Sequence, residues 1–146
     1  MPTIPLALLM LLAFAIGDAC KELETGMYVA NATKGWLSAE LLPAVVFIIS
    51  SFIAFSTGTS WGTFAIMLAI SIPMATIHGA DVTIIVAATL GGGIFGDHCS
   101  PISDTTIISS MASASDHIDH VKTQLPYAII GGIISTVLYL ILGFFG

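Results

Sequence analysis

The sequence contains no arginine and only three lysines among its 146 residues. A surface that binds nucleic acid needs clustered basic side chains to neutralise phosphates, so nucleic acid is excluded as a partner. Charged residues of both signs make up only 8% of the chain, against about 25% in ordinary soluble domains. So few charges cannot cover a folded surface in water. Together with 56% hydrophobic residues, this deficit predicts an integral membrane protein.

Cysteine is scarce as well, with only Cys20 and Cys99 in the chain. There is no CxxC pair and no spacing typical of a metal finger, so we expect two buried free thiols that act as small hydrophobic groups. The sequence also lacks a specific nucleophile–base pair or cofactor loop. We therefore expect neither an enzyme nor a bound cofactor.

Long apolar runs are abundant, and a membrane-spanning helix needs about 20 mostly apolar residues. The first and last runs, at residues 4–20 and 125–145, are each predicted to form one uninterrupted span. The two middle runs, at residues 40–77 and 82–114, are too long for one span and contain polar or glycine-rich interruptions. Aqueous loops are expected at residues 21–38 and 116–122.

The first interruption occupies residues 56–63, where every residue except Trp61 is Ser, Thr or Gly. This octet predicts a re-entrant helical hairpin over residues 40–77, with Gly58 and Gly62 at the break. Non-helical backbone at membrane depth must be buried in protein or line a cavity, because lipid cannot satisfy its polar groups.

The second interruption, at residues 91–104, contains four glycines and one proline. Glycine has little helical preference and proline removes a backbone donor, so a discontinuous helix is predicted across residues 82–115, broken at Gly96 and Pro101. Free carbonyls at a half-helix end, joined by Ser and Thr hydroxyls, suit a small hard cation such as Na⁺. The opposite helix ends suit an anion, so the break alone does not choose the ligand.

Three ionisable residues lie inside this second interruption: Asp97, His98 and Asp104. A carboxylate at membrane depth is by default a functional hypothesis. One carboxylate that binds either a proton or a cation, but not both, is a physical basis for exchange. Structural roles stay open: Asp104 as a helix N-cap, His98 as the partner of a local carbonyl, and each hydroxyl as a donor to the carbonyl four residues earlier.

The remaining ionisable residues are expected to be solvated. His78 and Asp81 lie in a short link, and Asp18 lies near the end of the first span. The spacing of His117, Asp119 and His120 is compatible with a metal site, but a solvated loop is the favoured interpretation.

The two interrupted segments resemble signature segments of the NhaC-type Na⁺/H⁺ antiporters. The resemblance is carried by residues 55–64 and 96–106, and it continues through 109–112 to 116–117. It implies a carrier of the wider ion-transporter superfamily, built from two inverted repeats with re-entrant and broken helices. Members exchange Na⁺ for protons, exchange organic acids such as malate and lactate, or move amino acids. They are much longer, so residues 1–146 are expected to form a single transmembrane domain, the C-terminal portion of a transporter whose N-terminal half is missing.

The sequence therefore predicts an all-α, multi-pass protein of the inner (plasma) membrane that exchanges Na⁺ or Li⁺ for protons. Its expected partners are membrane lipid, the transported ions and the missing N-terminal half, with a homodimer as a further possible assembly; no metal is expected beyond transported Na⁺. The alternatives are an ion-coupled exchanger of organic acids or amino acids, and a membrane scaffold without transport. Proton coupling is assigned to Asp97, Asp104 and His98. The predicted cation-binding residues are Ser56, Thr57, Thr59, Ser60, Asp97, Ser100, Ser103, Asp104 and Thr105.

Overall fold

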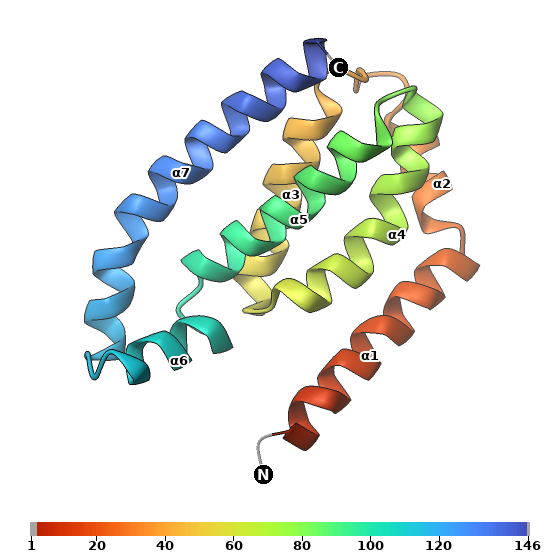
Figure 1. Cartoon of the computed structure of the whole chain (residues 1–146). Coiled ribbons are helices and arrows are strands. Elements are labelled where there is room, and N and C mark those ends of the chain that lie inside the picture. The colour runs from red at the N-terminus through yellow and green to blue at the C-terminus, as the bar shows by residue number, and fades with distance from the viewer. Residues whose placement is uncertain (1–2, 146) are drawn as a thin grey trace.

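The computed structural model of the chain describes residues 3–145, and Met1, Pro2 and Gly146 lie outside it. Within this range the chain forms α-helices and turns and no strand, which confirms the all-α class (Figure 1). The helices are α1 (Thr3–Glu22), α2 (Thr25–Thr33), α3 (Leu42–Thr57), α4 (Ser60–His78), α5 (Val82–Cys99), α6 (Asp104–Ala112) and α7 (His117–Phe145).

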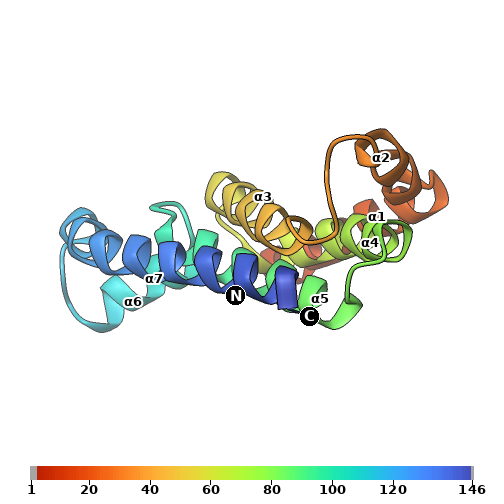
Figure 2. The same cartoon turned by 90° about the horizontal axis from the view of Figure 1, so that it is seen from above.

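The helices form a flattened layer, seen from above in Figure 2, with α7 on one side and α1 on the other in Figure 1. α5 runs through the middle of this layer and packs against α3, α4 and α7. The buried core lies around it and includes Val46 and Phe47 of α3, Met67 of α4, and Ile85 and Ala88 of α5. The second helical segment of the discontinuous element, α6, lies at the lower end of this layer in Figure 1.

The closest approach between helices is the crossing of α3 and α5, and it depends on glycine. A Cβ atom at Gly92 would collide with the carbonyl oxygen of Phe47, and one at Gly96 would collide with that of Ser51. Small residues four positions apart let two helix backbones approach in this way. The prediction that residues 91–96 interrupt the helix, with Gly96 at the break, is therefore wrong. α5 continues to Cys99, because these glycines serve packing on α3.

The turn between α3 and α4 is shorter than the predicted interruption. Gly58 adopts a left-handed conformation with φ of 67°, and Thr59 is the N-cap of α4, its side chain accepting a hydrogen bond from the backbone of Gly62. Gly58 is thus a break residue as predicted. Gly62 is not, because it lies in the first turn of α4. The re-entrant character of this hairpin and the inverted repeat stay predictions.

Both predicted loops contain helix. α2 forms within residues 21–38 because Gly26 lies against the backbone of Ala69 and Ala30 is fully buried. His78 is not a solvated link residue: its Nε2 lies 3.2 Å from the Ala30 carbonyl oxygen and 3.2 Å from Thr33 Oγ1. α7 begins at His117 and so includes most of the loop predicted at residues 116–122.

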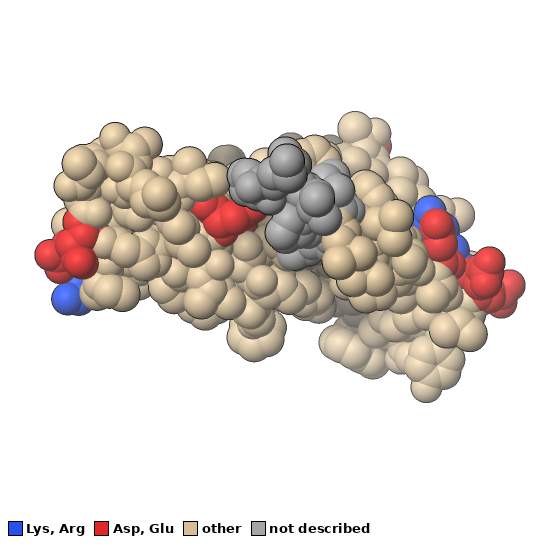
Figure 3. All heavy atoms as spheres, turned by 90° about the horizontal axis from the view of Figure 1, so that it is seen from below, with Lys and Arg blue, Asp and Glu red and all other residues tan. Residues whose placement is uncertain are grey.

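Within the described residues, α4, α5 and α7 are long and apolar enough to cross a membrane. α7 exposes many large apolar side chains, including Ile130, Ile133 and Leu138. Figure 3 shows the molecule from below, with charged side chains confined to a few separate places on an otherwise uncharged face. Cys99 is buried and Cys20 is half-buried, and both are free thiols.

Replacement of Gly96 by alanine is expected to destabilise the protein by about 1–3 kcal/mol, because the added methyl group overpacks the contact with Ser51. The matched control is Gly131→Ala on α7, where a Cβ would meet no neighbouring atom within 4 Å. That change should be neutral or stabilise by up to about 1 kcal/mol through helix propensity. Thermal unfolding of the complete membrane protein in detergent checks both; equal effects of the two substitutions would contradict the packing role of Gly96.

Acidification is expected to weaken the N-cap of α5. The Asp81 carboxylate accepts hydrogen bonds from the backbone of Thr83 (2.7 Å) and Ile84 (3.1 Å), and these contacts, that of Ile84 first, hold the pKa of Asp81 below its ordinary value. A lowered pKa means that the stabilisation is complete above the unfolded value of about 3.9 and is lost as the pH falls through the folded value. The melting temperature, relative to that of Asp81→Asn, should therefore drop below about pH 4. A difference that is constant between pH 3 and pH 6 would argue against this cap.

Candidate functional site: a helix break around Asp97

The helix break is the segment of residues 100–103 between α5 and α6. Ser100 ends α5 in an extended conformation, Pro101 has no backbone N–H to donate, and Ser103 is the N-cap of α6. The Ser103 hydroxyl oxygen accepts a hydrogen bond from the backbone of Thr106 at 3.4 Å. Pro101 thus lies in the break as predicted, and the chain leaves one helix and enters the next within four residues.

Asp97 lies in the last turn of α5, next to this break, and is 2% exposed. The Ser103 hydroxyl donates to its Oδ1 at 2.9 Å, and the Thr105 hydroxyl donates to its Oδ2 at 2.6 Å. The two hydroxyl oxygens lie 2.7 Å apart. Three oxygen–oxygen contacts thus join Asp97, Ser103 and Thr105, and the two hydroxyl groups supply two protons among them.

No lysine in the described part of the chain forms an ion pair with the Asp97 carboxylate. The ion pairs found there are Lys21 with Asp18 and Lys122 with Asp119, and all four side chains are largely exposed. A buried carboxylate without a countercharge is costly, so the site calls for a cation or a proton. Among the described residues no group of three His, Cys, Asp or Glu side chains could hold a metal ion. One carboxylate with hydroxyl groups instead offers hard oxygen ligands.

The other two predicted proton-coupling residues differ from Asp97. Asp104 is exposed, and its Oδ1 accepts a hydrogen bond from the backbone of Thr105 at 2.8 Å. The N-cap role that was left open for Asp104 belongs to Ser103 instead, although Asp104 places negative charge in the first turn of α6. His98 is also exposed, and its Nδ1 lies 2.9 Å from the Ile94 carbonyl oxygen, which is the local role considered for it.

The two interrupted segments meet at one point. A Cβ atom at Gly58 would lie 2.9 Å from the carbonyl oxygen of Ile102, so the α3–α4 turn packs directly on the helix break. The hydroxyls of Ser56 and Thr57 donate to carbonyls four residues earlier in α3. Thr57 and Thr59 also line a cavity of about 430 Å³ whose other walls are mostly apolar, so it provides few ligands for a cation.

Ser100 is fully buried beside Asp97, and its hydroxyl oxygen accepts a hydrogen bond from the Ile102 backbone at 3.4 Å. The structure thus brings together four of the predicted residues, Asp97, Ser100, Ser103 and Thr105. Asp104 adjoins them at the surface. Ser56, Thr57, Thr59 and Ser60 lie at the neighbouring turn, and their role in cation binding stays a prediction.

Three residues near the break were not predicted. The Oγ1 of Thr106 is buried without a hydrogen-bond partner in the described structure. His117 Nε2 lies 2.7 Å from the Pro101 carbonyl oxygen, and Gln124 Nε2 lies 3.1 Å from the His98 carbonyl oxygen. Sequence analysis missed both because it placed the beginning of α7 in a solvated loop.

The chain matches the family model described as "Na+/H+ antiporter family" over residues 3–144. An uncharacterized protein of Haemophilus influenzae is 41% identical over 90% of this chain, and the malate-2H⁺/Na⁺-lactate antiporter of Bacillus subtilis is 35% identical over 66% of it. The Na⁺/H⁺ antiporter NhaC of Alkalihalophilus pseudofirmus is 31% identical over 74%. These alignments cover 26%, 21% and 22% of the respective relatives, so the chain spans about a quarter of their length. No solved structure matches the chain.

Loss of either hydroxyl that donates to Asp97 is expected to destabilise the fold. Thr105→Val should cost about 1.5–3 kcal/mol, the usual range for a hydrogen bond to a charged group. Thr76→Val is the matched control, because the Thr76 hydroxyl is exposed and donates only to the Ile72 carbonyl of its own helix. The free energy of unfolding in detergent checks this.

A double-mutant cycle separates the hydrogen bond from general packing. In the background of Asp97→Asn the cost of Thr105→Val should fall, because the charged acceptor is gone. If the two changes were simply additive, the charge-assisted contact would contribute nothing.

Proposed function

This chain belongs to the Na⁺/H⁺ antiporter family, and we propose that it forms part of a secondary transporter that exchanges Na⁺ or Li⁺ for protons. The observation that carries the proposal is the Asp97 carboxylate, which is buried in a helix break, held by two hydroxyls and unpaired with any lysine of the described chain. Such a group needs a positive partner, and a transported cation or proton supplies one.

Exchange follows from competition for this carboxylate. When Na⁺ is bound, its charge replaces the missing countercharge and the proton is released. When the site is protonated, the carboxyl group is neutral and no longer attracts Na⁺. The hydroxyl oxygens of Ser103 and Thr105 are proposed as ligands beside the carboxylate, with the Ser100 hydroxyl and backbone carbonyls at the C-terminal end of α5 as further ligands.

Asp104 is proposed to act at the entrance to the site. Its carboxylate is exposed and next in sequence to Ser103, one of the two donors to Asp97. An exposed negative charge raises the local concentration of cations and provides a second group that can exchange protons. His98, which directly follows Asp97 in the sequence and is also exposed, is the candidate residue for delivering protons to Asp97.

The proposed function includes an architecture. α3, with 16 residues and a length of about 24 Å, is short for a hydrocarbon core of about 30 Å, which supports a re-entrant hairpin formed with α4. We place the protein in the inner (plasma) membrane as a multi-pass protein. The remainder of a longer transporter, related to this part by an inverted repeat, would complete the transport path.

A second candidate is exchange of organic acids coupled to Na⁺ and protons. It is favoured by the 35% identity with the malate-2H⁺/Na⁺-lactate antiporter of Bacillus subtilis. The helix break suits this alternative too, since the N-terminus of α6 presents backbone N–H groups that attract a carboxylate.

The test uses everted vesicles that contain the product of the complete reading frame to which this chain belongs. A pre-formed pH gradient is followed with a dye while NaCl, LiCl, KCl and then malate or lactate are added. We expect NaCl alone to collapse the gradient. Asp97→Asn should slow this collapse by at least about tenfold, because a buried charged contact is worth more than the ~1.4 kcal/mol of one decade.

The matched control is Asp119→Asn, which removes an exposed carboxylate paired with Lys122 and should leave the rate unchanged. Collapse that needs an added organic acid would favour the second candidate. If no addition has an effect, or if Asp97→Asn and Asp104→Asn both behave like the unaltered protein, cation exchange at this site is refuted and a scaffold without transport becomes the better hypothesis.

A further inference from the structure

Two side chains of α7 hold backbone carbonyl groups of the α5–α6 connection, and neither belongs to the proposed cation-binding residues. His117 Nε2 lies 2.7 Å from the Pro101 carbonyl oxygen, and Gln124 Nε2 donates to the His98 carbonyl oxygen at 3.1 Å. Because a carbonyl oxygen can only accept, the first contact requires a proton on Nε2 of His117. Both contacts thus run from α7 to the backbone on either side of Ser100.

These carbonyls need partners because the helix ends there. In a continued helix, the His98 carbonyl oxygen would accept from the backbone N–H of Ile102. That N–H instead donates to the Ser100 hydroxyl at 3.4 Å. Gln124 supplies the missing donor, in a contact that, like that of His117 with Pro101, is exposed in the described chain.

The His117 ring also reaches α6. Its Nδ1 lies 3.2 Å from the Ser110 hydroxyl oxygen, near the C-terminal end of that helix. One imidazole therefore joins the helix break, α6 and the start of α7, which lie together at the lower left of Figure 1. Both ring nitrogens are engaged, which fixes the orientation of the ring.

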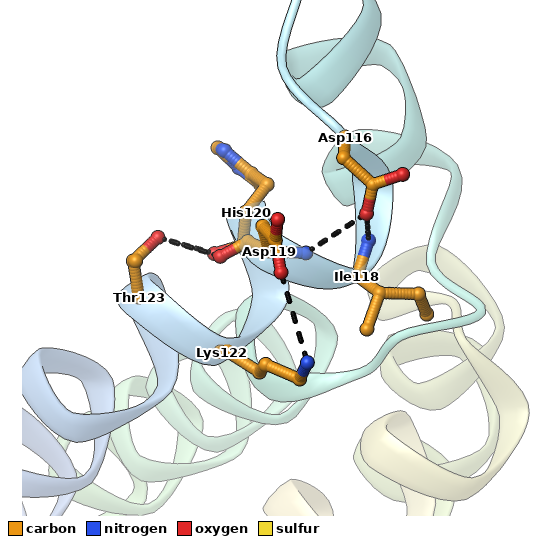
Figure 4. Close-up of polar contacts among 6 residues, drawn as sticks. All are labelled: Asp116, Ile118, Asp119, His120, Lys122 and Thr123. Atoms are coloured by element: carbon orange, nitrogen blue, oxygen red, sulfur yellow. Dashed lines mark hydrogen bonds and ion pairs between the residues drawn. The ribbon is translucent and has the colours of Figure 1, made fainter.

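The first turn of α7 is itself held firmly, as Figure 4 shows. The Asp116 carboxylate caps this turn and accepts hydrogen bonds from the backbone of Ile118 at 3.0 Å and of Asp119 at 3.2 Å. The Thr123 hydroxyl lies 2.9 Å from the carbonyl oxygens of both Asp119 and His120. His117 therefore projects from a hydrogen-bonded first turn, and its contact with Pro101 joins α7 to the break.

We propose that His117 and Gln124 are positioning residues that fix the backbone of residues 98–101 and thereby the shape of the Asp97 site. A movement of α7 would then change the shape of the Asp97 site directly. If α7 stays in place, the carbonyl oxygens of residues 98–101 keep a spacing suited to one cation. The structural part of this inference stands on the contacts of α7 alone. Its consequence for transport rests on the proposed function.

The experiment compares His117→Leu and Gln124→Leu with His120→Leu in the complete membrane protein. His120 is a matched control: it lies in the same turn of α7, but its Nε2 is enclosed without a hydrogen-bond partner in the described structure. Hydrogen exchange measured by mass spectrometry over residues 99–106 should accelerate about two- to tenfold in the first two variants, the range covered by one hydrogen bond of ordinary strength. It should not change in the control. His117→Gln, whose amide can still donate to the Pro101 carbonyl oxygen, should restore slow exchange.

Transport in vesicles provides the second measurement. We expect the ratio of the apparent KM for Na⁺ to that for Li⁺ to shift at least about twofold in both leucine variants, while a role in folding alone would lower only the maximal rate. Faster hydrogen exchange in His120→Leu equal to that in the other two variants, or an unaltered ratio in all three, would overturn the proposal. If the unaltered protein moves no cation, the proposed function fails, and the hydrogen exchange alone then supports or refutes the role of α7.

Discussion

Polar backbone groups in apolar surroundings must all find partners, and this requirement shapes the region around Asp97. Ending α5 at Cys99 leaves carbonyl groups without their helical donors. Side chains serve the backbone here instead: Gln124 donates to the His98 carbonyl, His117 to the Pro101 carbonyl in the break, and the Ser103 hydroxyl accepts from the Thr106 N–H at the start of α6. The break is therefore held by side-chain contacts from α7 and by the cap of α6, and the buried Asp97 carboxylate lies next to these contacts.

The rest of the fold brings other backbone close to this break. Gly92 and Gly96 allow α5 to lie directly on α3, and Gly58 lets the α3–α4 turn approach Ile102. Phe47 of α3 stacks on Phe95 of α5 at 5.8 Å between ring centroids, and it also contacts Tyr139 of α7 at 5.2 Å. These contacts hold α3, α5 and α7 together along the part of α5 that leads to Asp97. Packing of small residues thus determines where the carboxylate lies.

Composition and apolar runs were enough to predict an all-helical membrane protein, and two polar interruptions were enough to locate both turns. Their lengths were overestimated, because glycine was interpreted only through its weak helical preference. In α5 the same residues favour close packing on α3, which a single sequence does not reveal. The Asp97 cluster was largely predictable, since Ser103 and Thr105 follow it closely in sequence. His117 and Gln124 were not, because their partners lie 16 and 26 residues away and the contact depends on how α7 returns to the break.

The oxygen atoms in contact with the Asp97 carboxylate come from one short stretch of this chain, the hydroxyls of Ser103 and Thr105. The Ser100 hydroxyl accepts from the Ile102 backbone nearby, and the Thr106 hydroxyl is buried without a partner in the described structure. The Ser103 and Thr105 hydroxyls donate to the carboxylate, and the Ser103 oxygen also accepts from the backbone N–H of Thr106. A cation bound there would gain charge balance from Asp97 alone and would still be open on its other side. The chain spans about a quarter of its relatives' length, and in the proposed transporter protein outside this chain, or water, would close that side.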